Sequence, residues 1–131
     1  MTKADRIELT IPAKAEYFVA VRLCAASLAD RAGFDIDDIE DLKTAVAEAC
    51  LLLMRRGCQD RLEIEFMVDR VNLSIAVTAQ QTAKAQEKEL EDEFGVFLLE
   101  ALVDEVVCYA AGDCPVKQTC KLTKRQKQTR N

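Results

Sequence analysis

A single acidic residue, Glu48, stands in an otherwise apolar stretch of the chain, where its carboxylate could act as a general base. It lies in the segment from Asp35 to Gly57, whose apolar residues recur at intervals of three and four and therefore predict an α-helix. A carboxylate aimed into a pocket could accept the proton of an attacking hydroxyl group. A solvated glutamate on the outer side of the helix fits the same pattern, so the residues alone leave both interpretations open.

The chain contains no histidine, which excludes Ser-His-Asp catalysis, Cys-His catalysis and phosphohistidine chemistry. The cysteines form no CxxC pair, and without histidine they do not make the pattern of a zinc site. Because most of them lie in apolar periodic segments, we expect free thiols that pack as small apolar groups. Cys108 and Cys120 are the pair that a hairpin could place on neighbouring strands. The cysteines are Cys24, Cys50, Cys58, Cys108, Cys114 and Cys120.

Length, composition and charge indicate one globular domain. The chain has 131 residues, of which 50% are hydrophobic, and this is enough for an ordinary core. Its net charge of −5 argues against a nucleic-acid-binding surface. No apolar run approaches the roughly 20 residues of a membrane-spanning helix, and no signal peptide is recognisable. We therefore expect a cytoplasmic protein that binds neither membrane nor nucleic acid.

Hydrophobic periodicity predicts strands and helices that alternate in a simple order. Because strands with one apolar face need helices on one side only, we expect a two-layer α/β sandwich. In it, helices cover one face of a mixed, mostly antiparallel sheet. Residues 79–93 are small and polar, then acidic, as in a solvated linker or a short helix. The predicted elements are a strand at 7–12, helices at 13–32 and 35–57, strands at 62–68 and 71–77, a helix from 94 to about 104, and strands at 106–111 and 116–122.

Residues 123–131 contain no apolar side chain and several basic ones, among them Lys124 and Arg125. Such a segment cannot bury enough apolar surface to order itself. The sequence therefore predicts a single domain over residues 1–122, followed by a basic disordered tail over 123–131.

Three stretches resemble the anti-sigma-factor serine kinases of bacteria, of the sigma-B and sporulation sigma-F antagonist type. The stretches are residues 7–13 with Glu16, Tyr17 and Arg22 soon after, residues 38–50, and residues 94–106. Together they span almost all of the predicted domain. The resemblance implies the histidine-kinase-like ATPase fold, partner switching between a sigma factor and an anti-anti-sigma protein, and the homodimer that this family often forms.

The resemblance also implies that the nucleotide site is degenerate. Four residues after Glu48, the family has an Asn that binds Mg²⁺, but this chain has Leu52, which offers no oxygen ligand. The acid and the glycine of the family's adenine-binding Asp-x-Gly correspond to Val77 and Ala79. Of the glycine-rich lid only Gly95 remains, behind a run of acids that would repel phosphates. We therefore expect no ATP and no Mg²⁺, with Glu48 as a vestigial base.

The resulting hypothesis is a nucleotide-independent, anti-sigma-factor-like module that binds a sigma factor, an anti-anti-sigma protein, or both. Its expected contact residues are Glu16, Tyr17 and Arg22 on the first helix, with Glu89 and Glu91 in the acidic segment. Two alternatives stay open. One is a serine kinase that binds ATP in an altered mode with Glu48 as the base. The other is a dimeric scaffold unrelated to sigma factors.

Overall fold

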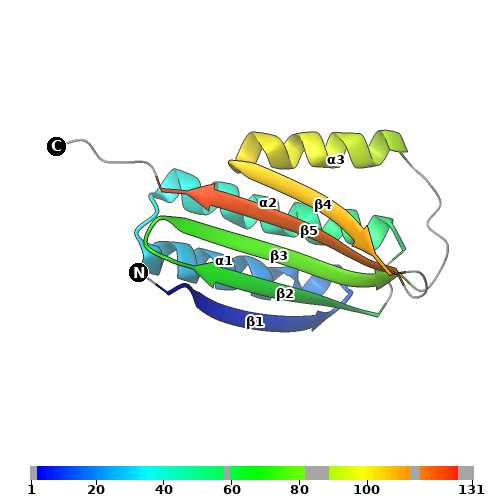
Figure 1. The fold of residues 1–131 in the computed structure, drawn as a ribbon, viewed down its shortest axis with the longest axis horizontal. Coiled ribbons are helices and arrows are strands. Elements are labelled where there is room, and N and C mark those ends of the chain that lie inside the picture. Colours follow the sequence, from blue (N-terminus) through cyan, green and yellow to red (C-terminus); the bar gives the residue numbers. More distant parts are fainter. Residues whose placement is uncertain (1–2, 58–59, 82–88, 113–115, 127–131) are drawn as a thin grey trace.

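The computed structural model describes residues 3–57, 60–81, 89–112 and 116–126. All pairings between the described strands are antiparallel, and they form one five-stranded sheet in the order β1-β2-β3-β5-β4. The helices cover one face of this sheet (Figure 1), so the predicted two-layer α/β sandwich is confirmed. The elements are β1 (Asp5–Pro12), a 3₁₀ turn (Ala15–Tyr17), α1 (Phe18–Ala32), α2 (Ile36–Arg55), β2 (Arg61–Val68), β3 (Asn72–Gln81), α3 (Glu89–Leu102), β4 (Glu105–Ala111) and β5 (Val116–Arg125).

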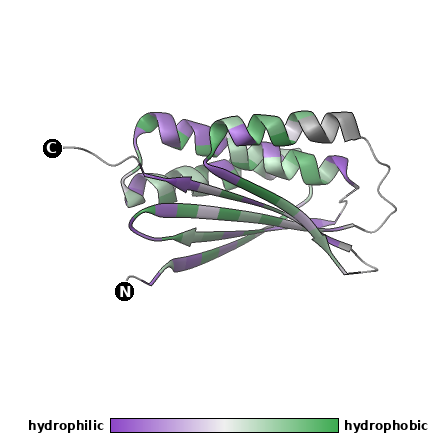
Figure 2. Ribbon diagram, turned by 45° about the horizontal axis from the view of Figure 1, so that its top comes forward, coloured by the Kyte–Doolittle hydropathy of each residue, from purple (hydrophilic) through white to green (hydrophobic). Residues whose placement is uncertain are grey.

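The strand register aligns the inward side chains in rows that cross the whole sheet. Side chains alternate between the two faces of a strand, so each row supplies one layer of the core under the helices. Figure 2 shows this alternation as bands of apolar and polar residues along the strands. The three central rows are Ile7–Phe66–Ile75–Leu122–Val106, Leu9–Ile64–Val77–Cys120–Cys108 and Ile11–Leu62–Ala79–Gln118–Ala110.

Helix α2 begins and ends as its sequence predicts. The Asp35 side chain accepts a hydrogen bond from the backbone N–H of Asp38, with an O–N distance of 2.8 Å, and so caps the first turn. At the other end Gly57 has a φ of 100°, which a side chain would disfavour. The buried side of the helix includes Leu42 and Val46, which are fully shielded from solvent.

The turn between β2 and β3 is held by the side chain of Asp69. Its Oδ1 accepts hydrogen bonds from the backbone N–H groups of Val71 and Asn72, at 2.7 and 2.6 Å. An aspartate side chain can thus replace the backbone bonds of a tight turn. This explains how Asp-Arg supports a hairpin without glycine, and the predicted hairpin is confirmed.

Two helices start at different residues from those predicted. Helix α1 begins at Phe18 rather than Ala13, because Ala15–Tyr17 form a separate 3₁₀ turn. Helix α3 begins at Glu89 rather than Phe94. Acidic residues suit the positive end of a helix dipole, so the end of the predicted linker continues as the first turns of α3. The middle of that linker, 82–88, lies outside the described residues.

The predicted boundary at residue 122 is wrong, because β5 continues to Arg125. Lys124 is buried there, with its ammonium 2.6 Å from the carbonyl oxygen of Leu102. It also lies 3.3 Å from Asp41 Oδ2 and 3.5 Å from Asp38 Oδ1. This cluster, which we call the Lys124 staple, joins the end of β5 to α2 and to the end of α3. Residues 127–131 of the predicted tail lie outside the described part of the chain.

The cysteines that the structure describes, Cys24, Cys50, Cys108 and Cys120, are thiols outside any disulfide, as expected. Cys58 and Cys114 fall outside the described segments. Among the helices of the described residues, none is long and apolar enough to cross a membrane.

The staple yields a stability prediction. Replacing Lys124 by Met keeps the length of the side chain but removes the cation that faces the buried Asp38 carboxylate. We expect the free energy of unfolding to fall by about 3 kcal/mol. Lys121→Met is the matched control, because Lys121 is exposed on the other face of the same strand, and it should change stability by less than about 0.5 kcal/mol. Urea denaturation measures both variants, and equal stabilities would refute the role of the staple.

Candidate functional site

Leu52 fills the space between α2 and α3. Its side chain is fully buried, and a Cβ atom placed on Gly95 would lie 3.3 Å from Leu52 Cδ1. That distance is tighter than an ordinary contact, so the isobutyl group already occupies the surface beside Gly95. The glycine thus serves the close packing of two helices here.

Glu48 lies one helical turn before Leu52 and is half-buried. Residues four apart lie on the same side of a helix, so Glu48 and Leu52 share the side of α2 that borders α3. The placement suits a base at the edge of a site, and it equally suits a partly solvated glutamate.

The inward-facing residues near the end of β3 are apolar. They stand where the family resemblance implies an adenine contact. Val77 is fully buried and Ala79 is almost so, and both point toward the helices. In the next strand, the neighbour of Ala79 is Gln118, whose Oε1 accepts a hydrogen bond from Arg56 Nη1 at 3.2 Å. The corner therefore holds two apolar side chains and a polar pair that joins α2 to β5. At the two positions that match the family's adenine contact, Val77 and Ala79 offer no carboxylate for an exocyclic amine.

Sequence reasoning missed the pair of Arg56 and Gln118. Gln118 is in phase with the buried Cys120 and Leu122, so the alternation along β5 already placed its side chain on the inward face. Arg56 was expected at the end of α2, where its charge suits the helix dipole. Its hydrogen bond to Gln118 on β5 can be identified only from the tertiary structure.

The contact residues predicted for the first helix are all exposed, and two of them lie in the 3₁₀ turn before α1. Glu16, Tyr17 and Arg22 are all exposed. The structure adds Val19 and Leu23, which are 54% and 60% exposed. Arg22 and Leu23 follow Val19 by three and four residues, so each lies next to Val19 on the surface of α1. We call the surface of Tyr17, Val19, Arg22 and Leu23 the α1 face. Its two aliphatic residues were missed, although they fall out of phase with the inner residues of the helix.

Glu89 and Glu91 lie in the first turns of α3, and their side chains are outside the described part of the structure. Helices α1 and α3 both pack on α2, and Figure 1 shows them toward opposite edges of the sheet. The structure thus does not bring the two predicted contact regions together.

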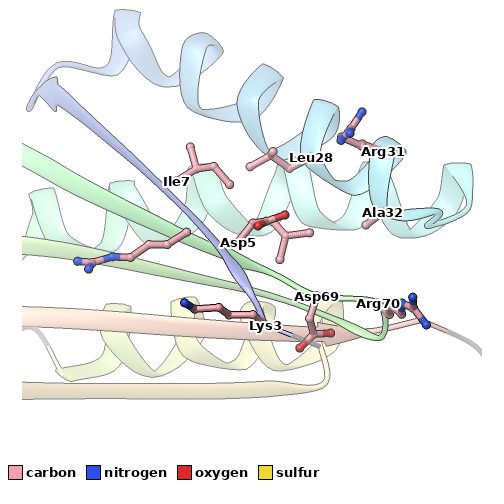
Figure 3. Close-up of a pocket in the computed structure, with 10 residues that line it drawn as sticks. Lys3, Asp5, Ile7, Leu28, Arg31, Ala32, Asp69 and Arg70 are labelled. Carbon is pink, nitrogen blue, oxygen red and sulfur yellow. The ribbon is translucent and has the colours of Figure 1, made fainter. Parts of the chain in front are cut away.

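A cavity of about 700 Å³ lies at the opposite end of the sheet from Ala79. It is bounded by the start of β1, the end of α1 and the β2–β3 turn (Figure 3). Ile7 and Leu28 contribute apolar surface, while Lys3, Arg31 and Arg70 contribute positive charge. None of its lining residues belongs to the set that the sequence analysis selected.

Comparisons with known proteins agree on the nature of the fold. The sequence matches the family model described as histidine kinase-like ATPase domain over residues 11–116. Serine-protein kinases RsbW from Bacillus cereus (strain AH187) and Bacillus mycoides (strain KBAB4) are 34% and 32% identical, over 81% of this chain and 78% of each relative. A crystal structure of the RsbU and RsbW domains of a Mycobacterium tuberculosis protein has a TM-score of 0.68 and 18% identity. It covers 96% of this chain, and this chain spans only 34% of that longer one.

The packing of Leu52 can be tested without any ligand. Leu52→Asn should lower the free energy of unfolding by about 2–4 kcal/mol, because the amide is buried without a designed partner and a void remains. Ile36→Asn is the control, since Ile36 lies on the same helix and is 77% exposed, and it should cost no more than about 0.5 kcal/mol. Thermal and urea unfolding of the three proteins give the values. A harmless Leu52→Asn would mean that residue 52 faces an open site.

Proposed function

Because the chain belongs to the histidine kinase-like ATPase family, in the group of the anti-sigma-factor serine kinases, we propose that it is a nucleotide-independent regulator that binds a protein partner. The partner is a sigma factor, an anti-anti-sigma protein, or each in turn. The relatives carry the name serine-protein kinase. In our proposal, this chain keeps their scaffold without the kinase chemistry.

The burial of Leu52 carries this proposal. A Mg²⁺ ion that bridges phosphates needs oxygen ligands in near-octahedral geometry. At the position where the family supplies one, this chain places an isobutyl group packed against Gly95. Restoring the ligand would therefore require the two helices to repack as well.

The corner beside β3 supports the same proposal independently. Adenine recognition needs a group that accepts a hydrogen bond from the exocyclic amine, and Val77 and Ala79 have no such side-chain group. Both are instead part of the core. The hydrogen bond from Arg56 to Gln118 ties α2 to β5 over the same row of the sheet. Two separate contacts of a nucleotide are thus replaced by contacts within the protein.

The α1 face supports the binding of a protein. Interface cores are enriched in aromatic residues and arginine, and here Tyr17 and Arg22 stand beside the exposed Val19 and Leu23. Val19, Arg22 and Leu23 lie in the first turns of α1 and Tyr17 lies in the 3₁₀ turn just before it, so their backbone is held in regular structure before any partner binds. The acidic start of α3 adds a second region of charge, which would attract a basic partner such as a DNA-binding sigma factor.

Glu48 favours one competing function, a kinase with an altered mode of ATP binding. The residue has kept its place beside the former site and is only half-buried, so it could still accept a proton. That function requires a bound nucleotide, and a titration with nucleotide separates the two proposals.

We expect no binding of Mg–ATP. Isothermal titration of the chain should give no heat beyond dilution up to millimolar ATP, while a serine-protein kinase relative titrated in parallel should bind. The Leu52→Asn variant should also give no heat of binding, because Val77 and Ala79 still cannot make the adenine contacts. A micromolar dissociation constant for the unaltered chain would contradict the proposal and favour the competing function of a kinase.

We expect the partner to be recovered without nucleotide. A tagged chain should retain a sigma factor or an anti-anti-sigma protein from its native cell extract equally with and without ATP. Arg22→Glu, or Glu89→Lys with Glu91→Lys, should weaken that binding about tenfold or more. Arg31→Glu is the matched control, since Arg31 is exposed near the other end of α1. Recovery only with ATP, or unchanged recovery after both surfaces are reversed, would contradict the proposal.

A further inference from the structure

Two thiols face each other across the last pair of strands. Cys108 on β4 and Cys120 on β5 are direct partners in the antiparallel register, and their sulfur atoms are 3.0 Å apart. Directly opposed residues in antiparallel strands have Cα atoms about 4.5–5.5 Å apart, a separation that a disulfide can span. The backbone therefore needs no large movement for a bond to form.

The two sulfurs have different surroundings. Cys120 is fully buried, and its hydrogen bond to Cys108 together with burial raises the pKa of its thiol, against a smaller opposing effect of the Arg56 guanidinium. Cys120 therefore holds its proton at neutral pH and can donate it toward the sulfur of Cys108. Cys108 is half-buried on an edge strand, so it is the sulfur that a small oxidant reaches first.

We propose that Cys108 and Cys120 form a reversible redox site, in which a peroxide converts the two thiols into a disulfide between β4 and β5. This site is independent of nucleotide and of the partner surfaces proposed above. The strand register places the two sulfur atoms close enough for this covalent modification.

The reaction balances in two steps. Cys108 sulfur attacks the terminal peroxide oxygen, the O–O bond breaks, and the sulfenic acid of Cys108 forms with release of water from hydrogen peroxide. Cys120 sulfur then attacks Cys108 sulfur, the S–O bond breaks, and a second water leaves with the Cys120 proton. The dithiol loses two electrons, and the peroxide takes them up. A dithiol reductant reverses the bond by exchange.

The other described thiols are less suited to this reaction. Cys50 lies close enough to Cys120 to affect its pKa, but it is fully buried on α2 and cannot meet the oxidant first. Cys24 is half-buried on α1, where burial raises the pKa of its thiol. The site therefore has an accessible sulfur, Cys108, and a resolving sulfur, Cys120, in fixed contact.

The proposal is tested by oxidising the full chain. The reduced protein is incubated with hydrogen peroxide, its remaining thiols are blocked with N-ethylmaleimide, and tryptic peptides are mapped by mass spectrometry. We expect a Cys108–Cys120 linked pair of peptides that dithiothreitol releases. The melting temperature should rise by about 5 °C or more, because the bond closes a loop in the unfolded chain.

Two variants sharpen the result. Cys24→Ser should keep both the linked peptides and the rise in melting temperature, whereas Cys108→Ser should lose both. The proposal is overturned if peroxide leaves Cys108 and Cys120 open to the blocking reagent while it oxidises Cys24. It is also overturned if Cys120 links to Cys50, or if Cys108 ends as sulfinic acid. Cys108 and Cys114 lie on one tryptic peptide. Fragmentation of the linked peptides from the unaltered chain therefore assigns the bond to Cys108 even if a variant fails to fold.

Discussion

The structure depends on the burial of one side of α2. That side meets the sheet at β3 and β5 and has α1 and α3 as its neighbours, so both outer helices are placed by it. Apolar burial supplies the main driving force, and the Lys124 staple fixes the position by linking α2 to the ends of β5 and α3. A buried ammonium is tolerated only because two carboxylates and a carbonyl oxygen face it. The same helix side that orders the fold is the one that would border a nucleotide.

Under the proposed function, this double role would allow the fold to stay stable without a nucleotide. A nucleotide pocket leaves a gap in the core. Its polar residues lower the stability of the fold when no ligand forms hydrogen bonds with them. Leu52, Val77 and Ala79 complete the core at those positions. Helices α1 and α3 pack on α2 toward opposite edges of the sheet, so the exposed α1 face lies away from Gly95 and the core could close without altering it. Under the proposed function, stability and partner binding would therefore depend on separate surfaces.

Sequence reasoning succeeded where local rules decide the structure. Hydrophobic periodicity depends on neighbours in the chain, and the strands and helices that it predicts are confirmed. It failed at Lys124, because a basic residue looks solvated until Asp38, Asp41 and Leu102 are brought to it from distant segments. The sequence leaves the acidic segment as a solvated linker or a short helix for a similar reason, since a helix dipole favours those acids only once the helix exists. At the site, sequence identified the exchanged residues, whereas the contact of Leu52 with Gly95 and the pair of Arg56 and Gln118 required coordinates.

The close approach of Gly95 to Leu52 also constrains how this sequence can change over time. A methyl group at position 95 would lie 3.3 Å from Leu52 Cδ1, so the leucine would have to shift by a few tenths of an ångström to accept it. The residue tolerated at position 95 therefore depends on the residue at position 52. A glycine under this packing constraint can be retained even in a chain that binds no phosphate. Its presence in a sequence then reports on the neighbouring helix, and says little about a nucleotide.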